Sequence, residues 1–226
     1  MTLFIVPTPI GNLKDITFRA IETLKECDLI LAEDTRRTGI LLKAYEISKP
    51  MISLHEHNEV GQTQKIIPLL KSGQKICIVS DGGTPLISDP GFKFVRECIR
   101  SGVEIVPLPG SNAAITSLTA SGLPTDSFTF VGFLPKKQGK TKTLITEGVE
   151  EGRTLIAYES PYRIKKTIAL FKEIIPNNPI CICRELTKVH EEIIRGTPQE
   201  IEVKIGKRDL KGEITLIIGS QPIGEK

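Results

Sequence analysis

The chain has 226 residues, with 30 lysines and arginines against 27 aspartates and glutamates, and therefore a net charge of +3. This length allows one large or two small domains with a true hydrophobic core. The weak positive charge is compatible with a nucleic-acid partner, but the sequence has no long basic stripe that would indicate one. No apolar segment is long enough to span a membrane, and the N-terminal apolar run is predicted to be a strand rather than a secretory signal.

The first half of the sequence alternates between strand-like and helix-like runs. Strands are expected at 3–7, 28–34, 51–55, 75–80 and 104–110, and helices at 15–27, 35–45, 60–73, 91–102 and 111–122. Short apolar strands separated by amphipathic helices are typical of a largely parallel sheet that is covered by helices. The pattern therefore predicts an α/β domain at 1–122.

The second half has a more mixed pattern, and the segment 123–127 marks the change. Strands are expected at 128–135, 153–160, 180–186 and 213–220, a helix at 161–176, and turns with a possible hairpin at 196–212. The stretch 135–143 is basic and of low complexity. We therefore expect a second α/β domain at 123–226 that contains a mixed sheet.

Four loops follow strands of the first domain, at 7–13, 33–38, 80–91 and 107–114. Ligands of open parallel sheets bind at the carboxyl ends of the strands, where these loops would lie. Gly82 and Gly83 allow the backbone to approach a ligand closely, and the helix that begins near Ser111 offers free N–H groups to an acceptor such as a carboxylate. The loops therefore indicate a ligand site.

The residues of these loops also restrict the kind of ligand. The chain lacks the G-x-x-x-x-G-K-[ST] pattern of phosphate-binding loops, and no G-x-G-x-x-G follows the first strand. The loops carry few lysines, so a polyphosphate would be poorly neutralised. A neutral or zwitterionic ligand with an adenine and a carboxylate suits them better.

Eight short motifs occur in order from residue 4 to about residue 219. They are VPTPIGNLKDIT, AEDTR, HEHNE, SDGGTPLISDPG, VPLPGSNAA, FVGFLPKK, YESPYRI and CRELTKVHEEIIRGT. Each alone is a weak signal, but in this order the chain resembles the tetrapyrrole-methylase superfamily. AEDTR, HEHNE and YESPYR resemble its branch that methylates small-subunit ribosomal RNA.

The resemblance implies two α/β domains with S-adenosylmethionine in a cleft between them, a homodimer, and a cytoplasmic location. The implied activity is 2′-O-methylation of a cytidine in the decoding region of 16S ribosomal RNA, with the small (30S) subunit as substrate. The alternatives are methylation of a corrin or porphyrin precursor, methylation of a diphthine precursor, and a non-catalytic RNA-binding module.

The resemblance also implies positions for the methyl-donor contacts. In the first domain these are Ile10, Asp81, Gly82, Gly83, Thr84, Ile87, Asn112 and Ala113, and in the second they are Leu134, Tyr158, Glu159 and Leu186. Family members usually have alanine where this chain has Gly82, and the smaller residue should be tolerated. The loop at 80–91 also has a purely structural interpretation, in which Ser88 or Asp89 caps the helix that starts near Pro90.

Three residues are candidates for catalysis. Asp34 or Glu159 could accept the proton of the ribose hydroxyl, and Arg36 could bind an RNA phosphate. The structural alternatives are a capped helix start after residue 34 and a helix cap at Glu159.

No metal site is expected. His55 and His57 lack further ligands, as do Cys181 and Cys183, which would share one face of a strand. The five cysteines show no disulfide spacing, so we expect free, buried thiols in a reducing cytosol.

Overall fold

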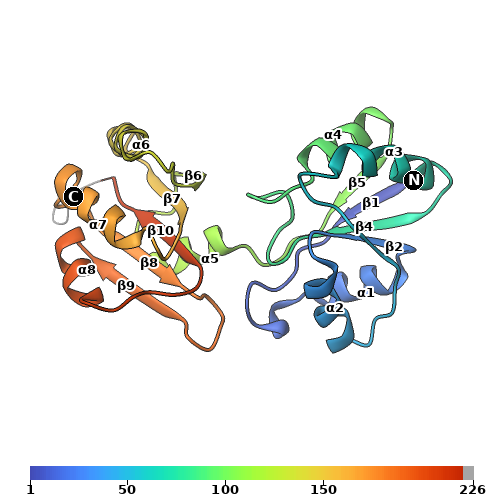
Figure 1. Cartoon of the computed structure of the whole chain (residues 1–226), viewed down its shortest axis with the longest axis horizontal. Helices are drawn as coiled ribbons and strands as arrows, with labels where there is room; N and C mark the ends of the chain where they lie inside the picture. Colours follow the sequence, from blue (N-terminus) through green and yellow to red (C-terminus); the bar gives the residue numbers. More distant parts are fainter. Residues whose placement is uncertain (221–226) are drawn as a thin grey trace. The chain divides into compact units, whose positions relative to one another are not determined.

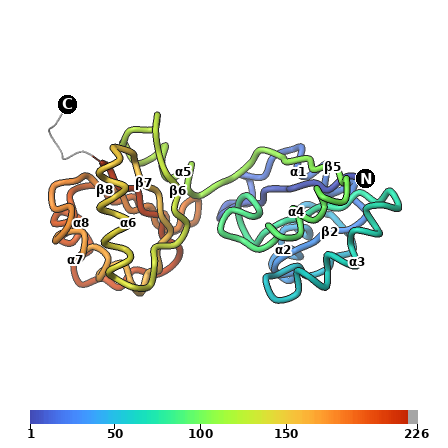
Figure 2. Tube along the Cα trace, turned by 90° about the horizontal axis from the view of Figure 1, so that it is seen from above, coloured from blue at the N-terminus to red at the C-terminus, as the bar shows by residue number. Residues whose placement is uncertain are grey.

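The computed structural model describes residues 1–220 and contains two compact units, Met1–Asn112 and Ala113–Lys226 (Figures 1 and 2). The sequence pattern places the division one helix later, after residue 122. The difference is helix α5 (Ala113–Ser121), which packs against strands of the second unit. Arg195 of the second unit donates hydrogen bonds to the carbonyls of Ala120 and Ser121 at the end of α5, at 3.1 and 3.2 Å.

The first unit is built on a five-stranded, fully parallel sheet with the order β3-β2-β4-β1-β5. Its strands are β1 (Thr2–Ile5), β2 (Leu29–Ala32), β3 (Met51–Ser53), β4 (Lys75–Val79) and β5 (Glu104–Pro107). Its helices are the 3-10 turn η1 (Leu13–Asp15), α1 (Phe18–Glu26), α2 (Thr35–Ala44), α3 (Glu59–Lys71) and α4 (Phe92–Arg100). The predicted parallel α/β sheet is confirmed.

Helices cover both faces of this sheet, as Figure 1 shows. On one face, Ile66 of α3 and Phe94 of α4 pack against strand residues such as Ile76. On the other face, Leu24 of α1 and Leu42 of α2 pack against alternate strand residues. Because side chains alternate across a strand and both faces are covered, the strands are almost continuously apolar.

The starts of two helices differ from the sequence expectation. Helix α1 begins at Phe18 rather than at residue 15, because Thr17 caps it and its side chain accepts the N–H of Ala20 at 3.1 Å. Helix α4 begins after Gly91, and neither Ser88 nor Asp89 caps it. Its first turn is instead capped from α3, because the buried Glu59 carboxylate accepts the N–H of Phe94 at 2.7 Å.

The second unit contains a mixed five-stranded sheet with the order β6-β7-β10-β8-β9, in which only β6 and β7 are parallel. Its strands are β6 (Phe128–Phe133), β7 (Thr154–Glu159), β8 (Ile180–Arg184), β9 (Glu192–Gly196) and β10 (Ile214–Ile218). Besides α5 it contains α6 (Gln138–Glu150), α7 (Ile164–Ile174) and α8 (Pro198–Ile205). The predicted mixed sheet is confirmed.

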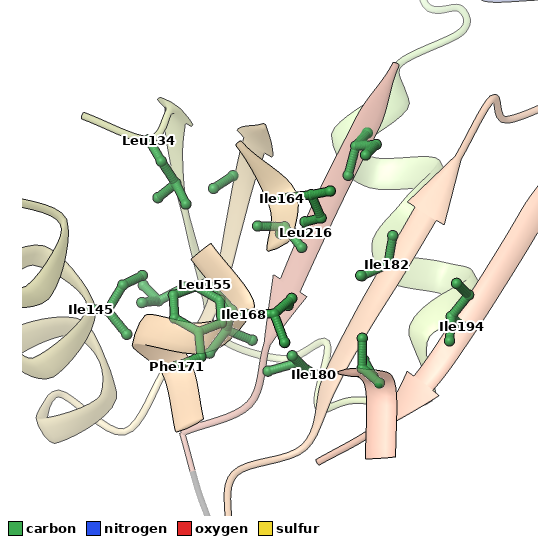
Figure 3. Packing of buried hydrophobic residues seen from close by; sticks show 14 of the residues in the cluster. Leu134, Ile145, Leu155, Ile164, Ile168, Phe171, Ile180, Ile182, Ile194 and Leu216 are labelled. Atoms are coloured by element: carbon green, nitrogen blue, oxygen red, sulfur yellow. The ribbon is translucent and has the colours of Figure 1, made fainter. Parts of the chain in front are cut away.

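The core of this unit lies between the sheet and helices α6, α7 and α8. Figure 3 shows Ile145 of α6 and Phe171 of α7 directed toward strand residues such as Leu155 and Leu216. Helix α5 covers the opposite face, where the Cys183 thiol lies 3.9 Å from a backbone carbonyl of α5.

Three elements of the second unit are not indicated by its sequence pattern. The basic stretch at 135–143 runs into helix α6. Its buried positions are Thr141, Ile145 and Gly148, so only one of the three carries an apolar side chain. The turns expected at 196–212 contain helix α8, which begins with Pro198 and a capping box between Thr197 and Glu200. Strand β9 lies within the motif CRELTKVHEEIIRGT, which the sequence pattern did not identify as a strand, and it pairs with β8.

All five cysteines are free and buried, as predicted. Cys181 and Cys183 lie on one face of β8 with their sulfurs 3.7 Å apart. Within residues 1–220, no group of three or more potential metal-binding side chains is arranged to hold an ion. None of the helices in that range is both long and apolar enough to cross a membrane.

Candidate functional site

The candidate site lies at the carboxyl edge of the parallel sheet, where the four predicted loops come together. The loops after β1 and β4 are joined by two backbone hydrogen bonds between Thr8 and Gly83, of 2.9 and 2.8 Å. The Thr8 hydroxyl also donates to the carbonyl of Ser80 at 3.1 Å. Neighbouring parallel strands end at the same edge, so these bonds fix one loop against the other.

The loop after β5 is attached to the same assembly. The Thr84 hydroxyl donates to the carbonyl of Ser111 at 3.0 Å, and the Ser111 hydroxyl donates to the carbonyl of Asp15 at 3.3 Å. Three segments that are far apart in the sequence therefore meet around Thr84. The expected donor contacts Ile10, Gly82, Gly83, Thr84 and Asn112 all belong to these segments.

The loop at 80–91 has an unusual backbone. Gly83 and Gly91 have φ of +90° and +114°, and Leu86 and Ser88 adopt φ of +74° and +64° although they are not glycines. Left-handed φ costs free energy for such residues and tends to occur at functional sites. A methyl group at Gly83 would lie 3.2 Å from Cγ2 of Ile10, so the side chain of Ile10 would have to move, and the positive φ of Gly83 also favours glycine.

A cluster of acidic side chains, here called the acidic group, is formed by Asp81, Glu33 and Asp89 at these loops. Asp81 accepts the backbone N–H of Asp34 at 3.0 Å and forms an ion pair with Arg37, also at 3.0 Å. Burial, and then the charge of Asp81, raises the pKa of Glu33. Burial, and then the charge of Glu33, raises the pKa of Asp89 to about 6. Such carboxyl groups are better proton acceptors near neutral pH than ordinary ones.

Two of the predicted catalytic residues, Asp34 and Arg36, form an ion pair with each other. Arg36 donates to both carboxylate oxygens of Asp34, at 3.0 and 2.7 Å, and the backbone N–H of Arg36 donates to the same carboxylate at 2.9 Å. These hydrogen bonds hold the pKa of Asp34 well below its usual range. Asp34 therefore acts as the helix cap of α2, and a carboxylate so stabilised in its charged form is a weak base.

Glu159 does not cap α7, which has no side-chain cap, but its carboxylate is fully engaged by neighbouring groups. Its side chain is 1% exposed and pairs with Arg163 at 2.5 Å. It also accepts the N–H of Ser160 and the hydroxyl of Thr167, both at 2.6 Å. These partners lie in the turn before α7 and in the first turn of the helix, so Glu159 stabilises the connection between β7 and α7, and its side chain is almost fully buried.

The other residues of the second unit that were predicted to contact the methyl donor are mostly buried. Leu134 is 2% exposed, its N–H donates to the carbonyl of Tyr158, and its own carbonyl accepts Arg163. Leu186 is buried next to Glu185 and Thr187, which have φ of +50° and +64°. Ala113, which was predicted as a contact from the first domain, begins α5 of the second unit and is half-buried.

The loops of the first unit suit a small zwitterionic ligand with an aromatic base. Gly82 and Ile87 are exposed, and Ile10, Thr84 and Asn112 are half-buried, so apolar and backbone groups are available together. The loops at 80–91 and 107–112 contain no lysine or arginine. These features fit S-adenosylmethionine better than a polyphosphate, which requires cationic neutralisation.

The fold and these loops define the class of the protein. A family model described as Tetrapyrrole (Corrin/Porphyrin) Methylases matches residues 2–202. The crystal structure of uroporphyrin-III-C-methyltransferase from Thermus thermophilus superimposes with a TM-score of 0.65 over 97% of this chain and 94% of that one, at 18% identity. The chain therefore belongs to the tetrapyrrole methylase family.

Within that family the chain belongs with proteins named ribosomal RNA small subunit methyltransferase I. The protein of that name from Halalkalibacterium halodurans is 48% identical over 225 residues, which are 100% of this chain and 77% of the relative. The one from Thermotoga maritima is 45% identical over 219 residues, which are 97% of this chain and 98% of the relative. The relatives thus differ in length, while the matched region is the same.

The sequence did not single out two residues that the structure brings forward. Asp89 was considered only as a helix cap, although the pair of aspartates that bounds the loop at 80–91 hinted at a shared site. Arg163 was seen only inside a motif, and its position four residues after Glu159 was the available signal, because such a spacing brings two side chains together at a helix start.

Proposed function

We propose that this chain is an S-adenosylmethionine-dependent methyltransferase that acts on small-subunit ribosomal RNA, at the 2′-hydroxyl of a cytidine in the decoding region. The observation that carries the proposal is the set of joined loops at the edge of the parallel sheet, in a chain whose relatives at 45–48% identity are named for that substrate. A cytoplasmic location and a homodimer belong to the same proposal.

The donor would be held by the loops of the first unit. The backbone of Gly82, Gly83 and Thr84 and the side chains of Ile10 and Ile87 would bind it, with Asn112 beside them. When bound, S-adenosylmethionine supplies an activated, electrophilic methyl group. The main contribution of the protein is then to position donor and acceptor, and rigid, hydrogen-bonded loops serve that purpose.

The ribose hydroxyl must lose its proton when its oxygen takes the methyl group. Asp34 is poorly suited to accept that proton, because Arg36 stabilises its charged form. Asp89 and Glu33 are better suited, because burial raises the pKa of both groups. We propose one of these two as the proton acceptor, and Arg37, which pairs with Asp81, as the residue that orients this acidic group.

The test is methyl transfer from labelled S-adenosylmethionine to small ribosomal subunits that come from cells lacking this gene. We expect label on a single ribose 2′-oxygen of the decoding region, located by nuclease digestion and mass spectrometry. Label on a base, or on RNA elsewhere, would contradict the proposed position. Subunits from wild-type cells serve as the control and should accept little label, because their site is already methylated.

The second candidate is methylation of a tetrapyrrole carbon, which the shared fold of the Thermus thermophilus structure favours. Uroporphyrinogen III offered in parallel should remain unlabelled. Label on the tetrapyrrole and none on RNA would replace the proposed function with this one. No turnover with either substrate, together with intact RNA binding, would favour a non-catalytic module.

A further inference from the structure

The second unit has an edge of its own at which aromatic rings are exposed. Tyr162, between β7 and α7, is 93% exposed, and Phe133 at the end of β6 is 61% exposed. Strands β6 and β7 are parallel, so the residues that follow them lie at the same edge of the sheet. Single exposed apolar side chains are common, but aromatic side chains that are exposed together at one edge can mark a binding surface.

Positive charge lies directly beside these rings. Lys136, Lys137 and Lys140 follow Phe133 in the chain and are all exposed. None of the ion pairs formed among residues 1–220 involves these three lysines, whereas the nearby Lys142 pairs with Glu173 at 3.1 Å. The edge therefore combines apolar rings with cations that no carboxylate of the described chain neutralises.

A buried network holds the two parts of this edge together. Arg163 donates hydrogen bonds to the carbonyls of Leu134 and Pro135, at 3.0 and 3.1 Å, and its charge is balanced by the buried Glu159 at 2.5 Å. Arg163 follows Tyr162 in the chain, and Pro135 precedes Lys136. The network therefore fixes the backbone that carries the tyrosine next to the backbone that carries the lysines.

We propose that Phe133, Tyr162, Lys136, Lys137 and Lys140 form a platform that binds single-stranded RNA of the substrate. Unstacked bases would stack on the aromatic rings, and the lysines would contact the phosphates, which is how proteins bind single strands. A second copy of this chain fits the surface less well, because a symmetric contact would bring together two copies of the same positively charged patch. This inference rests on the proposed RNA substrate and names the residues that select an unpaired strand.

The test measures fluorescence anisotropy of a short labelled single-stranded RNA with the full chain, and of a hairpin RNA of the same composition. Wild type should bind the single strand more tightly than the hairpin. Tyr162→Ala should weaken single-strand binding about 10-fold with an unchanged salt dependence, because stacking is lost and no charge is removed. Tyr162→Phe should retain wild-type affinity, since the ring remains.

The lysines have a different signature. The double variant Lys136→Gln with Lys137→Gln should reduce the slope of log affinity against log salt by about 1.4, since each phosphate contact on a single strand contributes about 0.7. Matched controls are Phe128→Ala, which removes an exposed ring from the opposite end of β6, and Lys43→Gln with Lys71→Gln. Both controls should bind RNA as wild type does.

The outcomes separate this inference from the proposed function. If wild type methylates small subunits but Tyr162→Ala binds single-stranded RNA as wild type does, the platform is wrong and the activity stands. If Tyr162→Ala changes the self-association of the chain, measured by ultracentrifugation, and leaves its RNA affinity unchanged, the platform is likewise overturned in favour of a contact between copies. Absence of RNA methylation by wild type would remove the proposed function itself.

Discussion

At the residue scale, the loop at 80–91 owes its form to a small number of positions. Gly83 combines a positive φ with a close approach to Ile10, and two non-glycine residues of the same loop also have positive φ. Such a conformation persists only where surrounding contacts maintain it, and the bonds between Thr8 and Gly83 do so here.

Replacing Gly83 with alanine should lower the affinity for S-adenosylmethionine at least 10-fold. The added methyl group would press on Ile10, and left-handed φ costs an L-residue about 1 kcal/mol. Gly73→Ala is the control, since Gly73 has φ of +98° with open space around it and lies at the opposite end of β4. Calorimetry should show intact donor affinity for Gly73→Ala, and equal losses in both variants would refute a role specific to the loop.

The acidic group predicts a particular pH dependence of stability. The pKa of Asp89 is about 6 in the folded chain against 3.8 for the ordinary carboxyl, because of burial and of the facing charges of Glu33 and Asp81. The folded state then binds this proton more tightly than the unfolded state, so stability falls as pH rises from about 4 to about 6.

Asp89→Asn should remove this loss. Relative to wild type, the free energy of unfolding should be unchanged at pH 4 and higher by about 1 kcal/mol at pH 7.5, after allowance for solvent screening. Urea unfolding at the two pH values measures the difference. If the variant is no more stable than wild type at pH 7.5, ionisation of Asp89 at that pH does not lower the stability of the folded chain.

At the element scale, helices are tied to one another by buried side chains from distant segments. Helix α4 has no side-chain cap of its own, and Glu59 from α3 supplies one. In the second unit, Glu159 and Arg163 connect the start of α7 to the end of β6 in the same manner. These contacts position the loops that carry the candidate functional residues.

Removal of the Glu59 cap should destabilise the chain measurably. Glu59→Ala leaves the buried N–H of Phe94 without an acceptor and should cost about 1–3 kcal/mol of unfolding free energy. Glu59→Gln keeps an acceptor oxygen and should cost less. Glu97→Ala, which removes only an exposed pair with Arg100, should cost less than about 0.5 kcal/mol. Equal losses for Gln and Ala in urea titrations would point to the charge, not the hydrogen bond.

At the scale of the whole molecule, each unit has a hydrophobic core of its own. Phe94 is fully buried in the first unit and Phe171 in the second, and the buried clusters they belong to share no residue. Stability should therefore be at least partly separable between the units.

Hydrogen exchange should reveal this separation. Phe171→Ala should destabilise the second unit by about 3–5 kcal/mol and accelerate amide exchange in β7, β8 and β10 while β1 and β4 stay protected. Phe94→Ala should produce the converse pattern. A uniform rise of exchange across both units in either variant would mean that the chain unfolds as one cooperative body.

The sequence by itself determined the class of fold and predicted the edge of the sheet at which the four loops meet. Short apolar strands between amphipathic helices predicted the parallel sheet of the first unit, because alternation and period are properties of a single segment. The positions of the four loops followed from the sheet, since parallel strands end at one edge. The order of motifs along the chain led to the methylase family, which the comparisons confirm.

The tertiary structure alone decided which side chains are available for chemistry. Asp34 and Glu159 seemed equal candidates in the sequence, but one is held by Arg36 and the other is buried under Arg163. Helix α6 was hidden because its buried positions include Thr141 and Gly148, and α8 because it is short and begins with a proline. Partners such as Asp34 with Asp81, or Arg163 with Leu134, are far apart in the sequence, and local patterns carry no information about contacts formed only by folding.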